Sequence, residues 1–135
     1  MTEEIFRITK DIERARDLFE MAQERLSEII SILPKEKYYK IIEEYYEVLV
    51  QLMTSLMYLD GYKTLSHIAL IEYVSKNYKE FSYNEIKLVD TLRKFRHGAV
   101  YYGKKVGPEF LINYEDEIKD VIKKLSKVVK GKLVN

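Results

Sequence analysis

The apolar positions of this chain recur at alternating intervals of three and four residues, which is the spacing of one face of an α-helix. The pattern is longest in residues 5–33, where it predicts one unbroken helix that ends before Pro34. Its apolar positions are Ile5, Ile8, Ile12, Ala15, Phe19, Ala22, Leu26, Ile29 and Leu33. No segment stands out with the alternation of a β-strand, so the pattern indicates an all-α protein.

Four further helices are predicted, each bounded by residues that stop or cap a helix. They cover about residues 36–59, 64–78, 82–103 and 109–130. The breaks are expected near Pro34, Gly61, Asn77–Ser82 and Gly103–Pro108. Ser82 and Glu85 have the spacing of a capping box. Because the connections are short, we expect an up-and-down bundle of about five helices, forming a single domain over residues 1–135.

The composition excludes several classes of site. The 135 residues include no cysteine and only two histidines, so there is no disulfide framework, no thiolate metal site and no histidine-rich zinc site. No spacing of carboxylates singles out a metal site, and there is neither a P-loop nor a dinucleotide fingerprint. We therefore expect no metal and no cofactor.

Charge and hydropathy indicate where the protein works. The net charge is +1, but residues 1–68 carry −4 and residues 69–135 carry +5, which lets two copies attract head to tail. The most apolar run, Val48–Leu59, is too short and too polar to span a membrane, and the N-terminal residues lack the apolar core of a signal peptide. These features, with many Glu and Lys residues, are typical of a cytoplasmic protein of a thermophile.

The helix over residues 82–103 carries the chain's candidate chemistry. At about 100° per residue, Arg93, His97, Tyr101 and Lys104 share one side, with Arg96 at its border. Guanidinium groups can bind a phosphate, and an imidazole can transfer a proton. The opposite side is an apolar stripe, predicted to pack into the core, formed by Leu88, Leu92, Phe95, Ala99 and Tyr102. A basic, solvated helix surface is the alternative interpretation of the polar side.

The chain's other aromatic and histidine residues have structural interpretations. There are twelve tyrosines and no tryptophan. The tyrosines are expected to pack at the border of the core, although tyrosine rings also stack on nucleic-acid bases. His67, in the first turn of the third predicted helix, is expected to be a structural histidine with a hydrogen bond near that turn.

Over about residues 36–125 the chain resembles the HEPN superfamily of small helical bundles. The segment Leu92-Arg93-Lys94-Phe95-Arg96-His97 is similar to the start of the family's signature helix. The approach to it resembles archaeal members: Asp60-Gly61-Tyr62 is followed by Ser66-His67 and Leu70-Ile71-Glu72-Tyr73. The resemblance implies a homodimer, RNA or nucleotide binding, and metal-independent RNA cleavage at a cleft between protomers. It also implies a toxin–antitoxin or defence setting, with a minimal nucleotidyltransferase as the antitoxin partner.

The site residues are carried over from this resemblance. Arg96 corresponds to the motif arginine that holds the scissile phosphate, and Arg93 and Lys104 would add phosphate contacts. Five residues after Arg96, where the family usually has histidine, this chain has Tyr101. Because the reference pKa of tyrosine is about 10, His97 is the better candidate for the acid or base, with Tyr101 orienting the substrate. A site that binds RNA without turnover, and a catalytically inactive helical dimerisation or protein-interaction module, are the alternatives.

Overall fold

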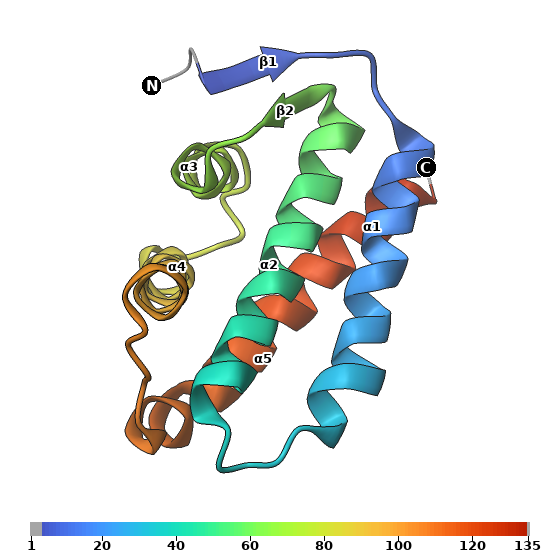
Figure 1. The fold of residues 1–135 in the computed structure, drawn as a ribbon. Helices are drawn as coiled ribbons and strands as arrows, with labels where there is room; N and C mark the ends of the chain where they lie inside the picture. Colours follow the sequence, from blue (N-terminus) through green and yellow to red (C-terminus); the bar gives the residue numbers. More distant parts are fainter. Residues whose placement is uncertain (1–3, 135) are drawn as a thin grey trace.

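The computed structural model describes residues 4–134 and has the predicted all-helical architecture (Figure 1). Five α-helices are present in this part of the chain: α1 (Ile12–Glu24), α2 (Tyr38–Asp60), α3 (His67–Asn77), α4 (Tyr83–Tyr102) and α5 (Pro108–Leu133). The four predicted breaks between helices are confirmed. Within the described residues, no helix is long and apolar enough to cross a membrane.

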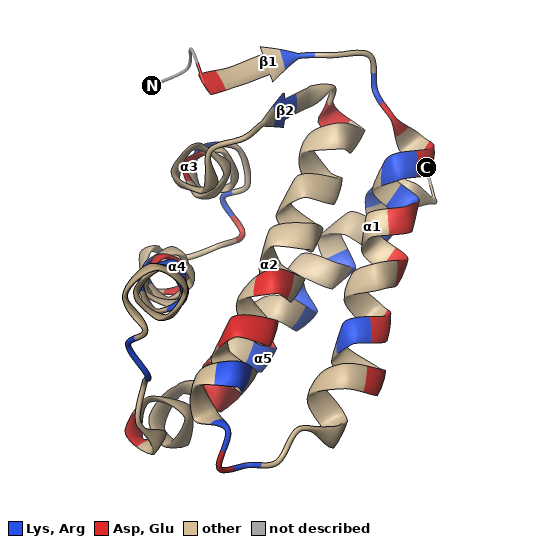
Figure 2. Cartoon of the chain, in the orientation of Figure 1, with Lys and Arg blue, Asp and Glu red and all other residues tan. Residues whose placement is uncertain are grey.

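Helix α2 lies at the centre and packs against all four other helices (Figure 1). Between Glu47 and Asp60 it has no charged residue, whereas its first half carries Glu43, Glu44 and Glu47 (Figure 2). A helix that is apolar on most sides must be surrounded by other elements. Accordingly Leu52 and Leu56 are fully buried in the core.

The prediction of a helix is wrong for the N-terminal part of residues 5–33, because this segment is a strand. Strand β1 (Ile5–Arg7) pairs antiparallel with β2 (Tyr62–Thr64), which also displaces the start of the third predicted helix to His67. The amide of Ile8 donates to the carbonyl of Gly61 at 2.9 Å. Gly61 ends α2 with a φ of 87°, a left-handed conformation that glycine adopts without strain. This turn brings the two short strands together, which no periodicity within residues 5–8 could indicate.

The C-terminal part of the same predicted helix is helical but irregular. After α1 the chain continues as a π-helical turn, η2 (Arg25–Ile29), and a 3₁₀ turn, η3 (Ile30–Ile32), before the break at Pro34. Ser27 and Ser31 donate their hydroxyls to carbonyls four residues earlier, at 3.1 and 2.6 Å. Such bonds compete with the helical ladder and often bend helices. The regular apolar spacing therefore predicted the helical segment but not its widened last turns.

Helix α4 begins and ends as predicted. The side chain of Ser82 accepts from the amide of Glu85 at 3.1 Å, and the carboxylate of Glu85 accepts from the amide of Ser82 at 2.8 Å, which completes the capping box. Gly103 closes the helix with a φ of 63°. Of the predicted apolar stripe, Leu92 is fully buried, but the placement of Tyr102 in the core is wrong. Tyr102 is 71% exposed because no described element covers the last turn of α4.

Candidate nucleic-acid interface

The predicted site residues lie along α4 but separate into two groups. Arg93 and Arg96 are half-buried and face α2 and α3, whereas His97 and Tyr101 are exposed near the C-terminal end of α4. Five residues correspond to about 140° around a helix, so Arg96 and Tyr101 point in different directions. The ring of His97 lies beside that of Tyr101, whereas the guanidinium of Arg96 is directed to Glu47 on α2.

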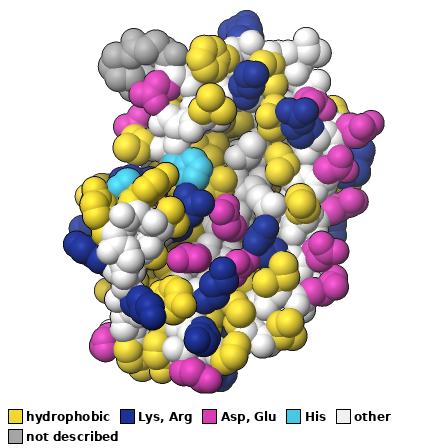
Figure 3. Space-filling model, viewed as in Figure 1, with side chains coloured by type: hydrophobic (Ala, Val, Ile, Leu, Met, Phe, Trp, Pro, Cys, Tyr) yellow, Lys and Arg dark blue, Asp and Glu magenta, His cyan; other side chains and the backbone are white. Residues whose placement is uncertain are grey.

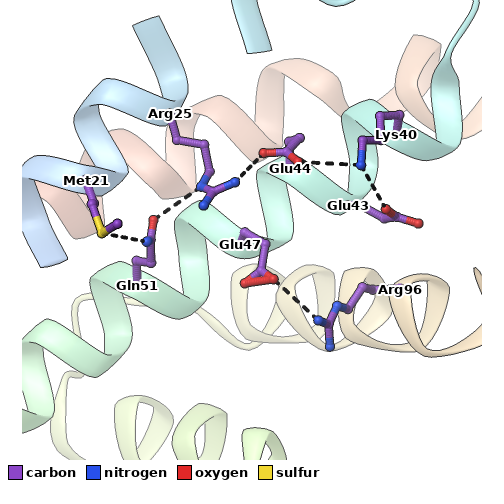
Figure 4. A network of polar contacts seen from close by, with 8 residues as sticks. All are labelled: Met21, Arg25, Lys40, Glu43, Glu44, Glu47, Gln51 and Arg96. Carbon is purple, nitrogen blue, oxygen red and sulfur yellow. Dashed lines mark hydrogen bonds and ion pairs between the residues drawn. The ribbon is translucent and has the colours of Figure 1, made fainter. Parts of the chain in front are cut away.

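The guanidinium of Arg96 contacts α2 through Glu47. One of its terminal guanidinium nitrogens lies 3.4 Å from a carboxylate oxygen of Glu47 (Figure 4). Figure 4 also shows Glu44, one turn earlier on α2, paired with Arg25 on the other side of the helix. The contact between Arg96 and Glu47 is long and lacks bidentate geometry, and both side chains are about one-third exposed. Arg96 is therefore oriented toward α2, but its guanidinium can exchange Glu47 for an anion that it binds more strongly.

Arg93 is held more firmly, by its own helix. Its Nε donates to the carboxylate of Asp90 at 2.7 Å, and Lys94 lies 3.5 Å from the other oxygen of the same carboxylate. Burial alone would raise the pKa of Asp90, but the hydrogen bond and charge of Arg93, together with Lys94, outweigh it and lower the pKa. The carboxylate of Asp90 is therefore ionised, and it holds the guanidinium of Arg93 within electrostatic reach of Tyr46 and His67.

Next to these arginines lies a pair of residues that the sequence analysis did not place in the site. The hydroxyl of the fully buried Tyr46, on α2, is 2.8 Å from Nδ1 of His67, at the start of α3. Burial raises the pKa of Tyr46. Burial, and then the positive charge of Arg96, lower the pKa of His67. Both groups are therefore neutral near pH 7, and the imidazole lies within electrostatic reach of the two guanidiniums.

His67 has the hydrogen bond expected of a structural histidine, but its partner is on a neighbouring helix and not in the adjacent turn. The sequence feature that could have pointed to Tyr46 was the doublet Tyr45-Tyr46. Its two hydroxyls bind different elements, since Tyr45 donates to Glu115 of α5 at 2.6 Å. Nothing in the spacing of residues 46 and 67 indicated that they meet.

The C-terminal end of α4 carries a cluster of exposed rings, which we call the aromatic end: His97, Tyr101 and Tyr102. The ring centroid of His97 lies 4.7 Å from that of Tyr101 and 5.9 Å from that of Tyr102. The two tyrosines are 66% and 71% exposed. The exposed Lys104 follows directly, and the ammonium of Lys105 lies 5.1 Å from the ring centroid of Tyr39. Flat rings and cations are therefore presented together to solvent.

The surface around α4 combines these groups on one face of the molecule. Figure 3 shows both histidines on this face, with Lys and Arg side chains beside them. Acidic side chains lie along the right-hand edge of the view, where α1 lies, and also in its centre, on the first half of α2 (Figures 2 and 3). Within residues 4–134, no three His, Asp or Glu side chains come together in an arrangement that could hold a metal ion. The arrangement can bind an anion and stack on planar groups.

Comparison with known proteins gives no relative from which to transfer a function: no family model, no curated protein and no solved structure matches the chain.

Proposed function

We propose that the protein is a HEPN-type domain that binds single-stranded RNA along α4. The observation that carries this proposal is the aromatic end, where three exposed rings lie on the same helix as Arg93 and Arg96. Proteins that bind single-stranded nucleic acid combine rings for the bases with cations for the backbone. The resemblance of this helix to the HEPN signature supports the same class of ligand.

The aromatic end supplies the stacking surface in this proposal. The exposed tyrosine rings can accept bases without first leaving a packed core, and base stacking contributes about 1–3 kcal/mol per base. Lys104 and Lys105 lie directly after the helix, where they can follow the phosphates of a strand stacked on Tyr101 or Tyr102. The next phosphates would then reach Arg96, which exchanges its long contact with Glu47 for a bidentate contact with a phosphate.

In the family reading, Arg96 also stabilises the charge that develops on a scissile phosphate, and His97 moves the proton. The exposure of His97, with Tyr101 beside it, leaves its ring accessible to a bound strand. Arg96 faces α2, whereas His97 faces solvent. A phosphate that contacts both residues must therefore lie over the surface of α4 between them, as in a cleft closed by a second protomer. We therefore propose binding as the primary function and metal-independent cleavage as an activity of the homodimer, with a nucleotidyltransferase as the antitoxin partner.

The binding proposal is tested by fluorescence anisotropy with a labelled single-stranded RNA of mixed sequence. Tyr101→Ala should weaken binding by about 1–3 kcal/mol through the loss of one stacked base. The matched control is Tyr83→Ala, since Tyr83 is 78% exposed at the opposite end of the same helix. Arg96→Gln should reduce the dependence of binding on salt by about one phosphate contact, whereas Lys87→Gln, on an exposed position of α4, should not.

The cleavage step is tested separately by incubating the protein with mixed RNA in the presence of a chelator. Loss of cleavage in Arg96→Ala and in His97→Ala, with RNA binding retained in His97→Ala, would support the assigned roles. Binding without cleavage would limit the function to RNA recognition. If wild-type protein does not bind RNA, or binds it as well after Tyr101→Ala and Arg96→Gln, the inactive helical interaction module becomes the better account of α4. The exposed Val100 next to the aromatic end is the feature that favours that second candidate.

A further inference from the structure

A cavity of about 760 Å³ lies between the end of the first helical segment, the start of α2 and the part of α5 from Leu111 to Ser126. It is on a different side of α2 from the α4 surface, and it is independent of the proposed RNA binding. Its apolar lining includes Leu26, Ile30, Leu33, Ile41, Leu111 and Ile122. Small-molecule sites are commonly concave, mostly apolar and roughly 300–1,000 Å³ in volume. The size and lining of this cavity therefore match those of a ligand site.

The cavity exists because the first helical segment changes its geometry beside α5. Gln23 is still joined to α5, through a 3.0 Å hydrogen bond from its side-chain amide to the hydroxyl of Ser126. Two residues later, at Arg25, the π-helical turn η2 begins, and Leu26 and Ile30 line the open space. π-helical turns are rare, and they occur frequently at functional sites. A continuous α-helix is expected to pack these apolar side chains against α5. The widened turn instead leaves them half-exposed.

The rim of the cavity is cationic. Lys35, Lys119 and Lys123 line it, and none of them forms an ion pair with another described residue. Lys119 and Lys123 are four residues apart on α5, a spacing at which like charges repel and weaken a helix. One carboxylate, that of Glu115, also lines the cavity, and it accepts a hydrogen bond from Tyr45 at 2.6 Å. The formal charge of the rim is therefore positive.

We propose that this cavity binds an amphipathic anion, a small molecule with an apolar chain or ring and a single carboxylate or sulfonate head group. The apolar part occupies the space between Leu26, Ile30 and Ile122, and the head group lies between Lys119 and Lys123. Lys35, in the connection after Pro34, contacts the same head group from the other side of the opening. The anion relieves the repulsion between the two lysines of α5, and the apolar part covers the side chains that η2 leaves half-exposed.

The test uses anilinonaphthalene sulfonate as a fluorescent probe on the full chain, displaced by octanoate, decanoate or dodecanoate. Each step of two methylenes should strengthen binding by up to about fifteenfold, because each fully buried methylene contributes a factor of about four. The double variant Lys119→Gln/Lys123→Gln should bind dodecanoate at least several-fold more weakly and dodecanol unchanged. Lys127→Gln, one turn further along α5 and outside the lining, is the matched control and should behave as wild type.

A second variant, Leu26→Trp, fills the cavity and should abolish displacement, with circular dichroism used to confirm that it folds. The lysine variants lie on the exposed surface of α5, so their result stands even if Leu26→Trp fails to fold. The proposal is overturned if the carboxylates do not displace the probe, if affinity does not rise with chain length, or if the lysine variants bind dodecanoate as wild type does. It is equally overturned if an acidic amphipathic peptide, and not dodecanoate, competes for the probe.

Discussion

The hydroxyl of Tyr46 lies 2.8 Å from Nδ1 of His67, and this contact joins the central helix α2 to the start of α3. Tyr46 is fully buried, and the guanidiniums of Arg93 and Arg96 act on both groups through space. The pair therefore lies between the core of the bundle and the two arginines of α4, and it connects the core to the candidate interface. Its integrity should affect both stability and binding.

Tyr46→Phe should lower the free energy of unfolding by about 1–3 kcal/mol, because it leaves a half-buried ring nitrogen of His67 without its partner. Urea denaturation followed by circular dichroism measures this difference. The control is Tyr38→Phe, since the hydroxyl of Tyr38 makes no hydrogen bond to any other residue that the structure describes. Equal stability of the two variants would show that the contact between Tyr46 and His67 contributes nothing.

The stability of the fold should fall as the pH is lowered below about 6.5. Burial and the charge of Arg96 lower the pKa of His67 in the folded state, while the unfolded chain has the ordinary value of about 6.5. The unfolded state therefore binds a proton first, and the stabilisation present above this pH is lost as His67 is forced to protonate. Denaturation at several pH values between about 8 and 5 measures this loss. The free energy of unfolding should decline less with falling pH in His67→Gln than in His97→Gln, the control variant at an exposed position.

The helices could be predicted from the sequence, but the strands could not. Apolar spacing, the Ser82 capping box and the glycines at 61 and 103 predicted the order of the helices and their breaks, because these signals act within a few residues of each other. The pairing of β1 with β2 joins segments more than fifty residues apart, and Ile5 continued the apolar spacing of the helix that follows. A three-residue strand has no periodicity strong enough to override such a pattern.

The candidate site was predictable only along its own helix. The positions of Arg93, His97 and Tyr101 relative to one another follow from the helical angle, and the contact between the rings of His97 and Tyr101 agrees with it. The partners of Arg96 and His67 depend on how α2, α3 and α4 pack, which a single sequence does not specify. Glu47 and Tyr46 had no feature that separated them from other charged and aromatic residues of α2.

Asp60→Asn should destabilise the protein by about 1–3 kcal/mol, because one carboxylate holds three partners. It accepts from the hydroxyls of Tyr73 and Tyr78 at 2.6 and 2.5 Å, and the ammonium of Lys132 lies 3.0 Å away. These contacts join the end of α2 to α3, to the turn after α3 and to the end of α5. Thermal unfolding should therefore shift clearly for Asp60→Asn and not for Asp116→Asn, an exposed position on α5.

Association of two copies should weaken with salt. Residues 1–68 carry a net charge of −4 and residues 69–135 a net charge of +5, so that opposite halves of two copies attract each other. Light scattering on the protein at micromolar concentration should give the mass of a dimer at low ionic strength. At high ionic strength the rate of association should fall, because the Debye length becomes shorter than the distance between the charges. A monomer at low salt would contradict the proposed homodimer.

RNA affinity should rise as the pH falls, if phosphates bind beside Arg93 and Arg96. In the free protein burial, and then the charges of Arg96 and Arg93, lower the pKa of His67 and keep it neutral, while the carboxylate of Glu47 acts in the opposite direction. A phosphate adds negative charge at the same place, so it raises the pKa of His67, and binding takes up a proton. Anisotropy titrations should be made in a His97→Gln background, which removes the other histidine. There the affinity should increase from about pH 8 to about pH 5, and adding His67→Gln should make it nearly independent of pH. If the pH dependence persists without His67, the phosphates bind elsewhere on α4 and the assignment of Arg96 as a phosphate ligand is wrong.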